Sequence, residues 1–156
     1  MKAVLLRLLT AVLGLAAVAA LVWQAQAGSE LVTFPKKHAE GVHYATIERG
    51  NLKEEIFTNR ATIDAVKARQ PMPSGTVITL VDYRDGKLLR YVVMEKRAAW
   101  GAGYPPAKRN GEWEFQAFDA DKSVNANENL DRCFSCHKGQ AQNGFVFTSD
   151  RMKNVN

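Results

Sequence analysis

Two cysteines and a histidine stand close together near the end of the chain, in the segment Cys133-Phe134-Ser135-Cys136-His137. On a helix, residues three and four apart share a face, so both thiols and the imidazole would point the same way. Thiols can add to the two vinyl groups of a porphyrin, and imidazole is a usual proximal ligand of haem iron. This spacing is the attachment pattern of c-type haem. Because it occurs once, it predicts one covalently bound haem c, with His137 as the proximal iron ligand.

Other uses of a Cys-x-x-Cys pair fit this sequence less well. A structural zinc site needs about four ligands, and the chain adds only the distant His38 and His43. A thioredoxin-like redox pair usually stands near the start of a βαβ unit, whereas this pair comes late in the chain. A disulfide across so short a loop would constrain little of the unfolded chain. His38 and His43 could also supply a sixth iron ligand, although histidines more often lie at the surface or within a strand.

The N-terminus has the layout of a secretory signal peptide. Two basic residues precede an apolar run at 8–22, and small residues follow at 25 and 27, the two positions that a signal peptidase reads. The apolar run is shorter than the roughly 20 residues that cross a bilayer, so an uncleaved anchor is the weaker alternative. We therefore expect 1–27 to be a signal peptide and 28–156 to be one periplasmic domain.

The charge of the chain limits its partners. The formal net charge of +5 falls to +3 once Lys2 and Arg7 leave with the signal peptide. So small a charge, without a basic run interleaved with aromatic residues, argues against nucleic-acid binding. We expect a mildly basic soluble surface, on which a few Lys or Arg side chains pair with the haem propionates.

The elements that must position the motif are mostly strands. Alternation and β-branched residues predict five strands, at residues 42–48, 52–57, 76–83, 88–96 and 112–118. Asp85-Gly86 is a hairpin signal between the third and fourth of them. One medium helix is expected at 60–69, and a short haem-binding helix at 130–138. Consecutive strands joined by tight turns favour an antiparallel sheet, so the predicted fold class is α+β and β-rich.

The chain resembles the family of cytochromes P-460 and cytochromes c′-β. The haem segment at 133–138, followed by Phe-Val-Phe-Thr at 145–148, is similar to that family's C-terminal signature. Gly-Thr-Val at 75–77, after a helix, and Gly-Glu-Trp at 111–113, opening a late strand, are similar too. The resemblance covers residues 34–148, most of the mature domain. It implies a curved antiparallel sheet with helices against it, assembled as a homodimer.

The two types of cytochrome in this family differ in the residues on the open side of the iron. It implies hydroxylamine oxidation, a porphyrin-linked lysine and a distal carboxylate for cytochromes P-460, but an apolar, aromatic pocket that binds nitric oxide for cytochromes c′-β. The position that matches the lysine is Leu80, and the carboxylate position falls near Val92. Phe57 and Leu52, from the preceding strand, would cap the same distal pocket. We therefore expect a chain closer to the c′-β type, unless Lys96 replaces the missing lysine.

These residues predict a periplasmic monohaem cytochrome that binds nitric oxide or a similar small diatomic gas, transfers electrons, or does both. An apolar wall offers no base for oxidising hydroxylamine and disfavours charged ligands. The alternatives are a hydroxylamine-oxidising enzyme, and an electron carrier whose sixth iron ligand is Met94 or Met72. Trp100 and Tyr104, in a loop rich in Gly and Pro, could line an interface or the haem edge. The motif itself specifies no redox partner protein.

Overall fold

The computed structural model describes residues 31–156, and the fold and the candidate site lie within this part of the chain. The predicted signal peptide at 1–27 lies outside the described residues. Within 31–156, none of the helices has the length and apolar character needed to cross a membrane.

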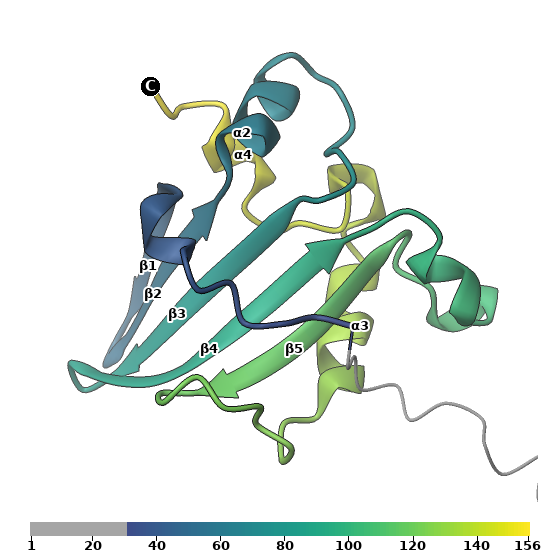
Figure 1. The fold of residues 1–156 in the computed structure, drawn as a ribbon. Coiled ribbons are helices and arrows are strands. Elements are labelled where there is room, and N and C mark those ends of the chain that lie inside the picture. The colour runs from purple at the N-terminus through teal and green to yellow at the C-terminus, as the bar shows by residue number, and fades with distance from the viewer. Residues whose placement is uncertain (1–30) are drawn as a thin grey trace, which may run out of the picture.

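Five antiparallel strands form one open sheet in the order β1-β2-β3-β4-β5 (Figure 1). They are β1 (Val42–Arg49), β2 (Leu52–Thr58), β3 (Val77–Arg84), β4 (Lys87–Lys96) and β5 (Trp113–Asp119). Neighbours in the sheet are also neighbours in sequence. Tight turns join β1 to β2 and β3 to β4, and longer connections, which include helices, join β2 to β3 and β4 to β5. At these turns Gly50 and Gly86 have φ of 58° and 73°, which glycine reaches without steric cost. The predicted α+β, β-rich fold class is confirmed.

The helices are short and lie outside the sheet. They are η1 (His38–Glu40), α2 (Arg60–Lys67), η2 (Trp100–Gly103), η3 (Pro106–Lys108), α3 (Leu130–Lys138), η4 (Ala141–Asn143) and α4 (Ser149–Met152). The side chain of Asn59 caps α2 by accepting a hydrogen bond from the Thr62 amide at 2.8 Å. This helix ends two residues before its predicted end at Arg69, which takes a left-handed φ of 58°. The helix predicted at 130–138 has its predicted bounds, whereas α4 and the four 3-10 helices are too short to show a period in the sequence.

The strand register sorts the side chains of the sheet onto two faces. On one face, Ile56, Leu80, Val92 and Ala117 pair across four strands in one row, and Ile78, Met94 and Phe115 form the next row. On the other face, Val81, Tyr91 and Phe118 form a row of their own. Because side chains alternate along a strand, neighbours such as Val92 and Val93 belong to opposite faces.

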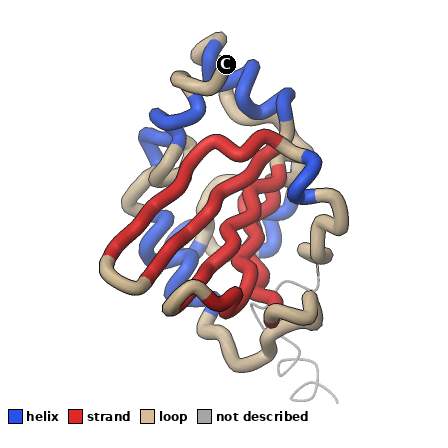
Figure 2. Tube along the Cα trace, turned by 90° about the vertical axis from the view of Figure 1, so that its left-hand side faces the viewer, coloured by secondary structure: helices blue, strands red, loops and turns tan. Residues whose placement is uncertain are grey.

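Different parts of the chain cover these two faces. Residues 31–38 cross the face that carries Tyr91, in front of the sheet in Figure 1. There the Phe34 ring lies edge-on to Tyr91 and Phe118, with ring centroids 5.0 and 5.3 Å apart. The opposite face packs against α3 and the C-terminal segment, which add buried side chains such as Phe134 and Val146. Figure 2 shows the strong twist of the sheet between these two coverings.

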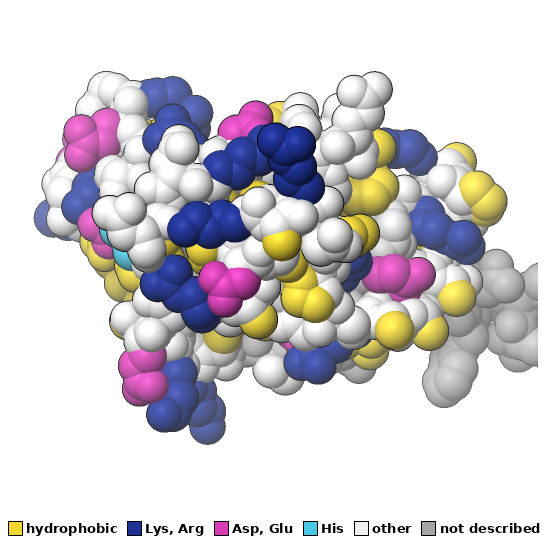
Figure 3. All heavy atoms as spheres, turned by 90° about the horizontal axis from the view of Figure 1, so that it is seen from above, with side chains coloured by type: hydrophobic (Ala, Val, Ile, Leu, Met, Phe, Trp, Pro, Cys, Tyr) yellow, Lys and Arg dark blue, Asp and Glu magenta, His cyan; other side chains and the backbone are white. Residues whose placement is uncertain are grey.

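The described surface mixes both signs of charge. Seen from the end that carries α2 and α4, Lys and Arg side chains are spread among fewer Asp and Glu side chains, with small hydrophobic areas between them (Figure 3). This end of the molecule therefore has the mildly basic character expected from the composition.

Candidate functional site

Helix α3 presents the Cys-x-x-Cys-His motif to a cavity and packs its other side into the core. Leu130 and Phe134, four residues apart, are buried, and the Phe134 ring lies 4.8 Å from that of Phe115 on β5. Cys133 and His137, also four apart, line the cavity together with Cys136. Both cysteines are free thiols, and Cys136 is exposed. Burial raises the pKa of the Cys133 thiol.

The cavity has a volume of about 500 Å³ and lies between α3 and the sheet. This is the size of a typical pocket for a cofactor or a small ligand. Its floor consists of apolar side chains on four strands, and its remaining wall comes from β1 and from the segment after α3. The lining residues are Ile47, Arg49, Glu54, Ile56, Ile78, Leu80, Arg90, Val92, Met94, Phe115, Glu128, Arg132, Cys133, Cys136, His137, Val146, Phe147 and Thr148.

The imidazole of His137 is oriented by a backbone carbonyl. Its Nδ1 lies 2.7 Å from the carbonyl oxygen of Phe145. Because a carbonyl can only accept, this contact requires the proton on Nδ1 and leaves the Nε2 lone pair free for a metal. Burial lowers the pKa of His137, while the hydrogen bond to Phe145 raises it. The rings of Phe115 and Phe147 flank the imidazole at 4.9 and 5.0 Å. The site thus offers a neutral, oriented imidazole ligand.

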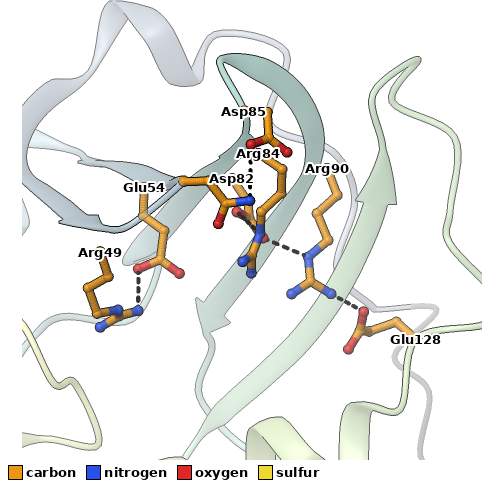
Figure 4. A network of polar contacts seen from close by, with 8 residues as sticks. Arg49, Glu54, Asp82, Arg84, Asp85, Arg90 and Glu128 are labelled. Carbon is orange, nitrogen blue, oxygen red and sulfur yellow. Dashed lines mark hydrogen bonds and ion pairs between the residues drawn. The ribbon is translucent and has the colours of Figure 1, made fainter.

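One end of the cavity is charged (Figure 4). The row next to Leu80 and Val92 places Glu54, Asp82 and Arg90 side by side on β2, β3 and β4. Arg90 donates to Asp82 at 3.2 Å and also bonds Glu128, and Arg49 pairs with Glu54 at 3.2 Å. Asp82 is buried, with a side chain only 1% exposed. The cavity is therefore apolar over two rows of the sheet and charged at the third.

Arg132 adds an uncompensated positive charge to this lining. It stands one residue before Cys133 and lines the cavity. Among the ion pairs formed within residues 31–156, none involves Arg132. With Arg49 and Arg90, three guanidinium groups face the cavity, and guanidinium is the group that best pairs with carboxylates.

These features fit a haem covalently held by α3. The cavity supplies an apolar floor for a flat macrocycle, an imidazole with a free Nε2, two thiols on one helix face, and guanidinium groups for the propionates. Zinc fits less well, because within the described part of the chain no group of three or more His, Cys, Asp or Glu side chains could hold a metal ion.

Of the distal residues expected from the sequence, Leu80, Val92 and Met94 all line the cavity. Leu80 pairs directly with Val92 across β3 and β4. The two positions that match the lysine and the carboxylate of cytochromes P-460 therefore lie side by side on the floor. Met94 stands one row further, between Ile78 and Phe115.

The expectation that Phe57 caps this pocket is wrong. Phe57 pairs with Thr79, and its sequence neighbour Ile56 is the partner of Leu80. The Phe57 ring therefore points to the opposite face of the sheet, where it contacts the rings of His38 and His43. Its place on the cavity floor is taken by Ile56. Side chains alternate along a strand, so the residue of β2 that pairs with Leu80 shares its face and the next residue does not. That pairing was the signal that could have identified Ile56.

Three further candidates lie away from the cavity. Leu52 is buried, yet it does not line the cavity. Met72 is packed in the core near Gly144, so it is not brought to the iron site. Lys96 donates from Nζ to the carbonyl of Met72, and no lysine in 31–156 lines the cavity.

The two remaining histidines and the loop aromatics also lie elsewhere. His38 and His43 contact Phe57 on the far face of the sheet. They are therefore away from the cavity, in agreement with their interpretation as surface or strand residues. Trp100 packs against the cluster on that face. Tyr104 lies at the back of α3 instead, where its hydroxyl donates to Glu114 at 2.8 Å.

A family model now agrees with this architecture. The model of the cytochrome P460 family matches residues 33–148, from the segment that crosses the sheet to the last residue of the cavity wall. The chain belongs to the cytochrome P460 family. No curated protein matches the chain closely enough to be named beside it. Membership of this family implies haem binding, in agreement with the cavity and the Cys-x-x-Cys-His motif.

The sequence did not reveal the charged end of the cavity. Arg90 precedes Val92 and Met94 at the same period of two, and Asp82 follows Leu80 at that period. That spacing was the available signal. The pairing of Glu128 with Arg90 spans 38 residues, and no local pattern predicts it.

Proposed function

We propose that the chain is an exported monohaem c-type cytochrome whose open iron site binds nitric oxide or a similar small neutral gas. One observation carries the proposal. The cavity that His137, Cys133 and Cys136 share has an apolar floor, with Leu80 and Val92 at the positions where cytochromes P-460 would carry the lysine and the carboxylate. The iron supplies gas binding and one-electron chemistry when haem is bound.

The protein's own part is attachment and orientation. Cys133 and Cys136 would hold a haem by adding their thiols to its vinyl groups, and His137 would supply a ligand to its iron. The His137 Nδ1–H donates to the Phe145 carbonyl, which would leave Nε2 available to the metal. The guanidinium group of Arg132, which joins no ion pair within residues 31–156, would stabilise a propionate carboxylate by charge-assisted hydrogen bonds, and Arg90 lines the same cavity.

The floor selects among ligands by polarity. Leu80 and Val92 offer no hydrogen-bond donor, no acceptor and no base. A small neutral diatomic molecule has little hydration to lose on entering this pocket. A charged or strongly hydrogen-bonding ligand would lose its hydration and find no polar partner to replace it. Nitric oxide binds ferrous haem without distal hydrogen bonds, while bound dioxygen benefits from them. Cys136 and Phe147 line the cavity and are exposed, so a haem held there would have an edge near solvent through which electrons could pass.

Oxidation of hydroxylamine is the weaker proposal for this cavity. That reaction needs proton transfer beside the iron. The cavity's carboxylates, Glu54 and Glu128, are engaged by Arg49 and Arg90. A lysine cross-link would need Lys96 to leave the Met72 carbonyl to which it donates.

A six-coordinate electron carrier is the second candidate function. The specific observation in its favour is that Met94 lines the cavity beside Phe115 and is 5% exposed. A thioether ligand would raise the reduction potential and suit electron transfer. Met94 is also well packed between Ile78 and Phe115, the usual role of methionine in a core.

Export and assembly complete the proposal. The periplasm is the compartment in which c-type haem is attached, so the proposed signal peptide at 1–27 and the haem motif support each other. A homodimer is proposed from the resemblance alone, and light scattering of the matured protein at two concentrations would test it.

The test is the intact mass of the protein recovered from the periplasm of a host with c-type haem maturation. We expect a chain that begins at Gly28 and carries the mass of one haem, unchanged by denaturation. A chain without added mass, or one that still includes residues 1–27, would contradict the corresponding part of the proposal.

A further inference from the structure

The turn at Gly144-Phe145 has an unusual backbone beside the proposed iron ligand. Both residues have left-handed φ, 64° for Gly144 and 66° for Phe145. Glycine reaches this region freely, but a bulky residue adopts it only where its surroundings enforce it. The carbonyl that Phe145 presents in this conformation is the one bonded to His137 Nδ1 at 2.7 Å. The strained residue and the partner of the imidazole are therefore the same residue.

Trp113 holds this turn from the sheet. Its indole Nε1 donates to the carbonyl of Gly144 at 2.9 Å. Trp113 is only 2% exposed, so water does not compete for this hydrogen bond. Trp113 stands two residues before Phe115 on β5, whose ring lies 4.9 Å from His137. A single strand thus fixes both the turn and a ring beside the imidazole.

Gly111 and Gln140 hold the other sides of the turn. The Phe145 amide donates to the carbonyl of Gln140 at 2.8 Å. A Cβ on Gly111 would come within 2.9 Å of Phe145 Cε2, which is closer than packed side chains allow. The Phe145 ring therefore lies directly on the Gly111 backbone, at a position whose φ of 58° also favours glycine.

We propose that Trp113, Gly111 and the Gly144-Phe145 turn form a positioning unit that sets the strength of the bond between iron and His137. This inference rests on the proposed function. A hydrogen bond from Nδ1–H makes the imidazole a stronger donor through Nε2, and a stronger donor favours the oxidised iron. Three contacts from two segments, residues 111–113 and Gln140, hold the accepting carbonyl in place, so the fold fixes its distance from Nδ1.

The unit assigns Trp113 a role that reaches beyond packing. If the indole only filled space, removing its N–H while keeping an aromatic ring would leave the haem properties unchanged. If it holds the turn, the same change lets the Phe145 carbonyl move away from His137 Nδ1. The imidazole then donates less to iron, and the reduced form gains relative to the oxidised form.

The test compares Trp113→Phe with Trp100→Phe in the matured haem protein. Trp100 packs against the cluster on the opposite face of the sheet and serves as the matched control. We expect Trp113→Phe to retain covalent haem, to lower the iron–histidine stretching frequency of the ferrous protein, and to shift the reduction potential to more positive values. Trp100→Phe should leave both quantities at their wild-type values.

A second variant keeps the test decisive if Trp113→Phe does not fold. Phe145→Gly removes the ring that rests on Gly111 and opens other backbone angles to the turn, so the carbonyl should be held less closely and the same two shifts should appear. Unchanged frequency and potential in a folded, haem-loaded variant would overturn the positioning role and leave the proposed function standing. Absence of covalent haem from the wild-type protein would overturn both.

Discussion

The two faces of the sheet carry similar side chains and differ in what covers them. On the face that bears Val93 and Tyr91, the chain's own residues 31–38 pack rings against Tyr91 and Phe118 and leave a smaller hollow of about 390 Å³ beside Phe57 and Thr79. On the face that bears Leu80 and Val92, α3 and the segment after it stand off the sheet and leave a cavity of about 500 Å³. Protein interiors are otherwise packed without voids of this size. Of the two faces, the second carries the Cys-x-x-Cys-His motif, and membership of the cytochrome P460 family implies that a haem binds.

The contrast holds between neighbouring residues on one strand. Val93 is 0% exposed and surrounded by protein, whereas Val92 is half-buried and lines the cavity. The first residue belongs to the stability of the fold and the second to the properties of the site. Substitutions that treat the two faces alike therefore serve to break or sharpen the comparison.

Removing the covalent anchor should have the largest effect. The double substitution Cys133→Ser with Cys136→Ser leaves no thiol to bond the porphyrin, so covalent haem should be lost completely. The measurement is haem staining of the denatured protein after electrophoresis. Ser135→Ala, an exposed residue between the two cysteines whose hydroxyl donates to Asp131, should retain full staining. Staining of the double variant would show that other groups hold the cofactor.

The second prediction separates the faces by stability. Val93→Ala removes buried methyl groups from a filled face and should lower the free energy of unfolding by about 2 kcal/mol, without changing the absorption spectrum. Val92→Ala should cost less than about 1 kcal/mol, because its side chain is only partly enclosed by protein, and should alter the rate of nitric oxide release. Chemical denaturation and stopped-flow spectroscopy measure the two quantities. Equal behaviour of the two variants would remove the distinction between the faces.

Much of this fold follows from local sequence patterns. Alternation identified all five strands, and Asp85-Gly86 at the β3–β4 turn behaves as the hairpin signal predicts, with φ of 50° and 73°. The haem helix also has its predicted bounds, because the sequence marks both its apolar face and the glycine that follows it. Strand alternation, turn residues and helix ends all depend on residues close in sequence, so the sequence alone is enough to predict them.

The site was predicted in part. The motif gave Cys133, Cys136 and His137, and the resemblance gave Leu80 and Val92, all of which line one cavity. Phe57 was misassigned, because a shift of one residue along a strand moves a side chain to the opposite face. The carbonyl of Phe145 could not be foreseen, since a left-handed turn at a phenylalanine contradicts its intrinsic preference and exists only through distant contacts.

The third prediction tests the polarity of the cavity floor. Leu80→Gln places a hydrogen-bond donor beside the iron site and should raise the affinity for dioxygen about tenfold, the contribution of one net hydrogen bond. Phe57→Leu, on the far face of the sheet, should leave gas binding unchanged. Oxygen equilibrium curves of the ferrous proteins provide the comparison. An effect of Phe57→Leu as large as that of Leu80→Gln would return Phe57 to the distal pocket.

The fourth prediction is the smallest effect. Met94→Leu keeps the volume of the side chain and removes its sulfur, so an open iron site should show the same reduced absorption spectrum before and after the change. Met72→Leu, in the core away from the cavity, is the control. Loss of a sharp α/β band pair in Met94→Leu alone would identify the thioether as the sixth ligand and favour the electron carrier.

The central claim is that one covalent haem sits on the apolar floor with an open coordination position. Its most direct test is the absorption spectrum of the reduced, matured protein during titration with nitric oxide. The account predicts a high-spin spectrum that changes as nitric oxide is added, with the pigment retained after acid-acetone extraction. A strongly red-shifted Soret band, a low-spin spectrum that ignores nitric oxide, or a colourless protein would contradict it.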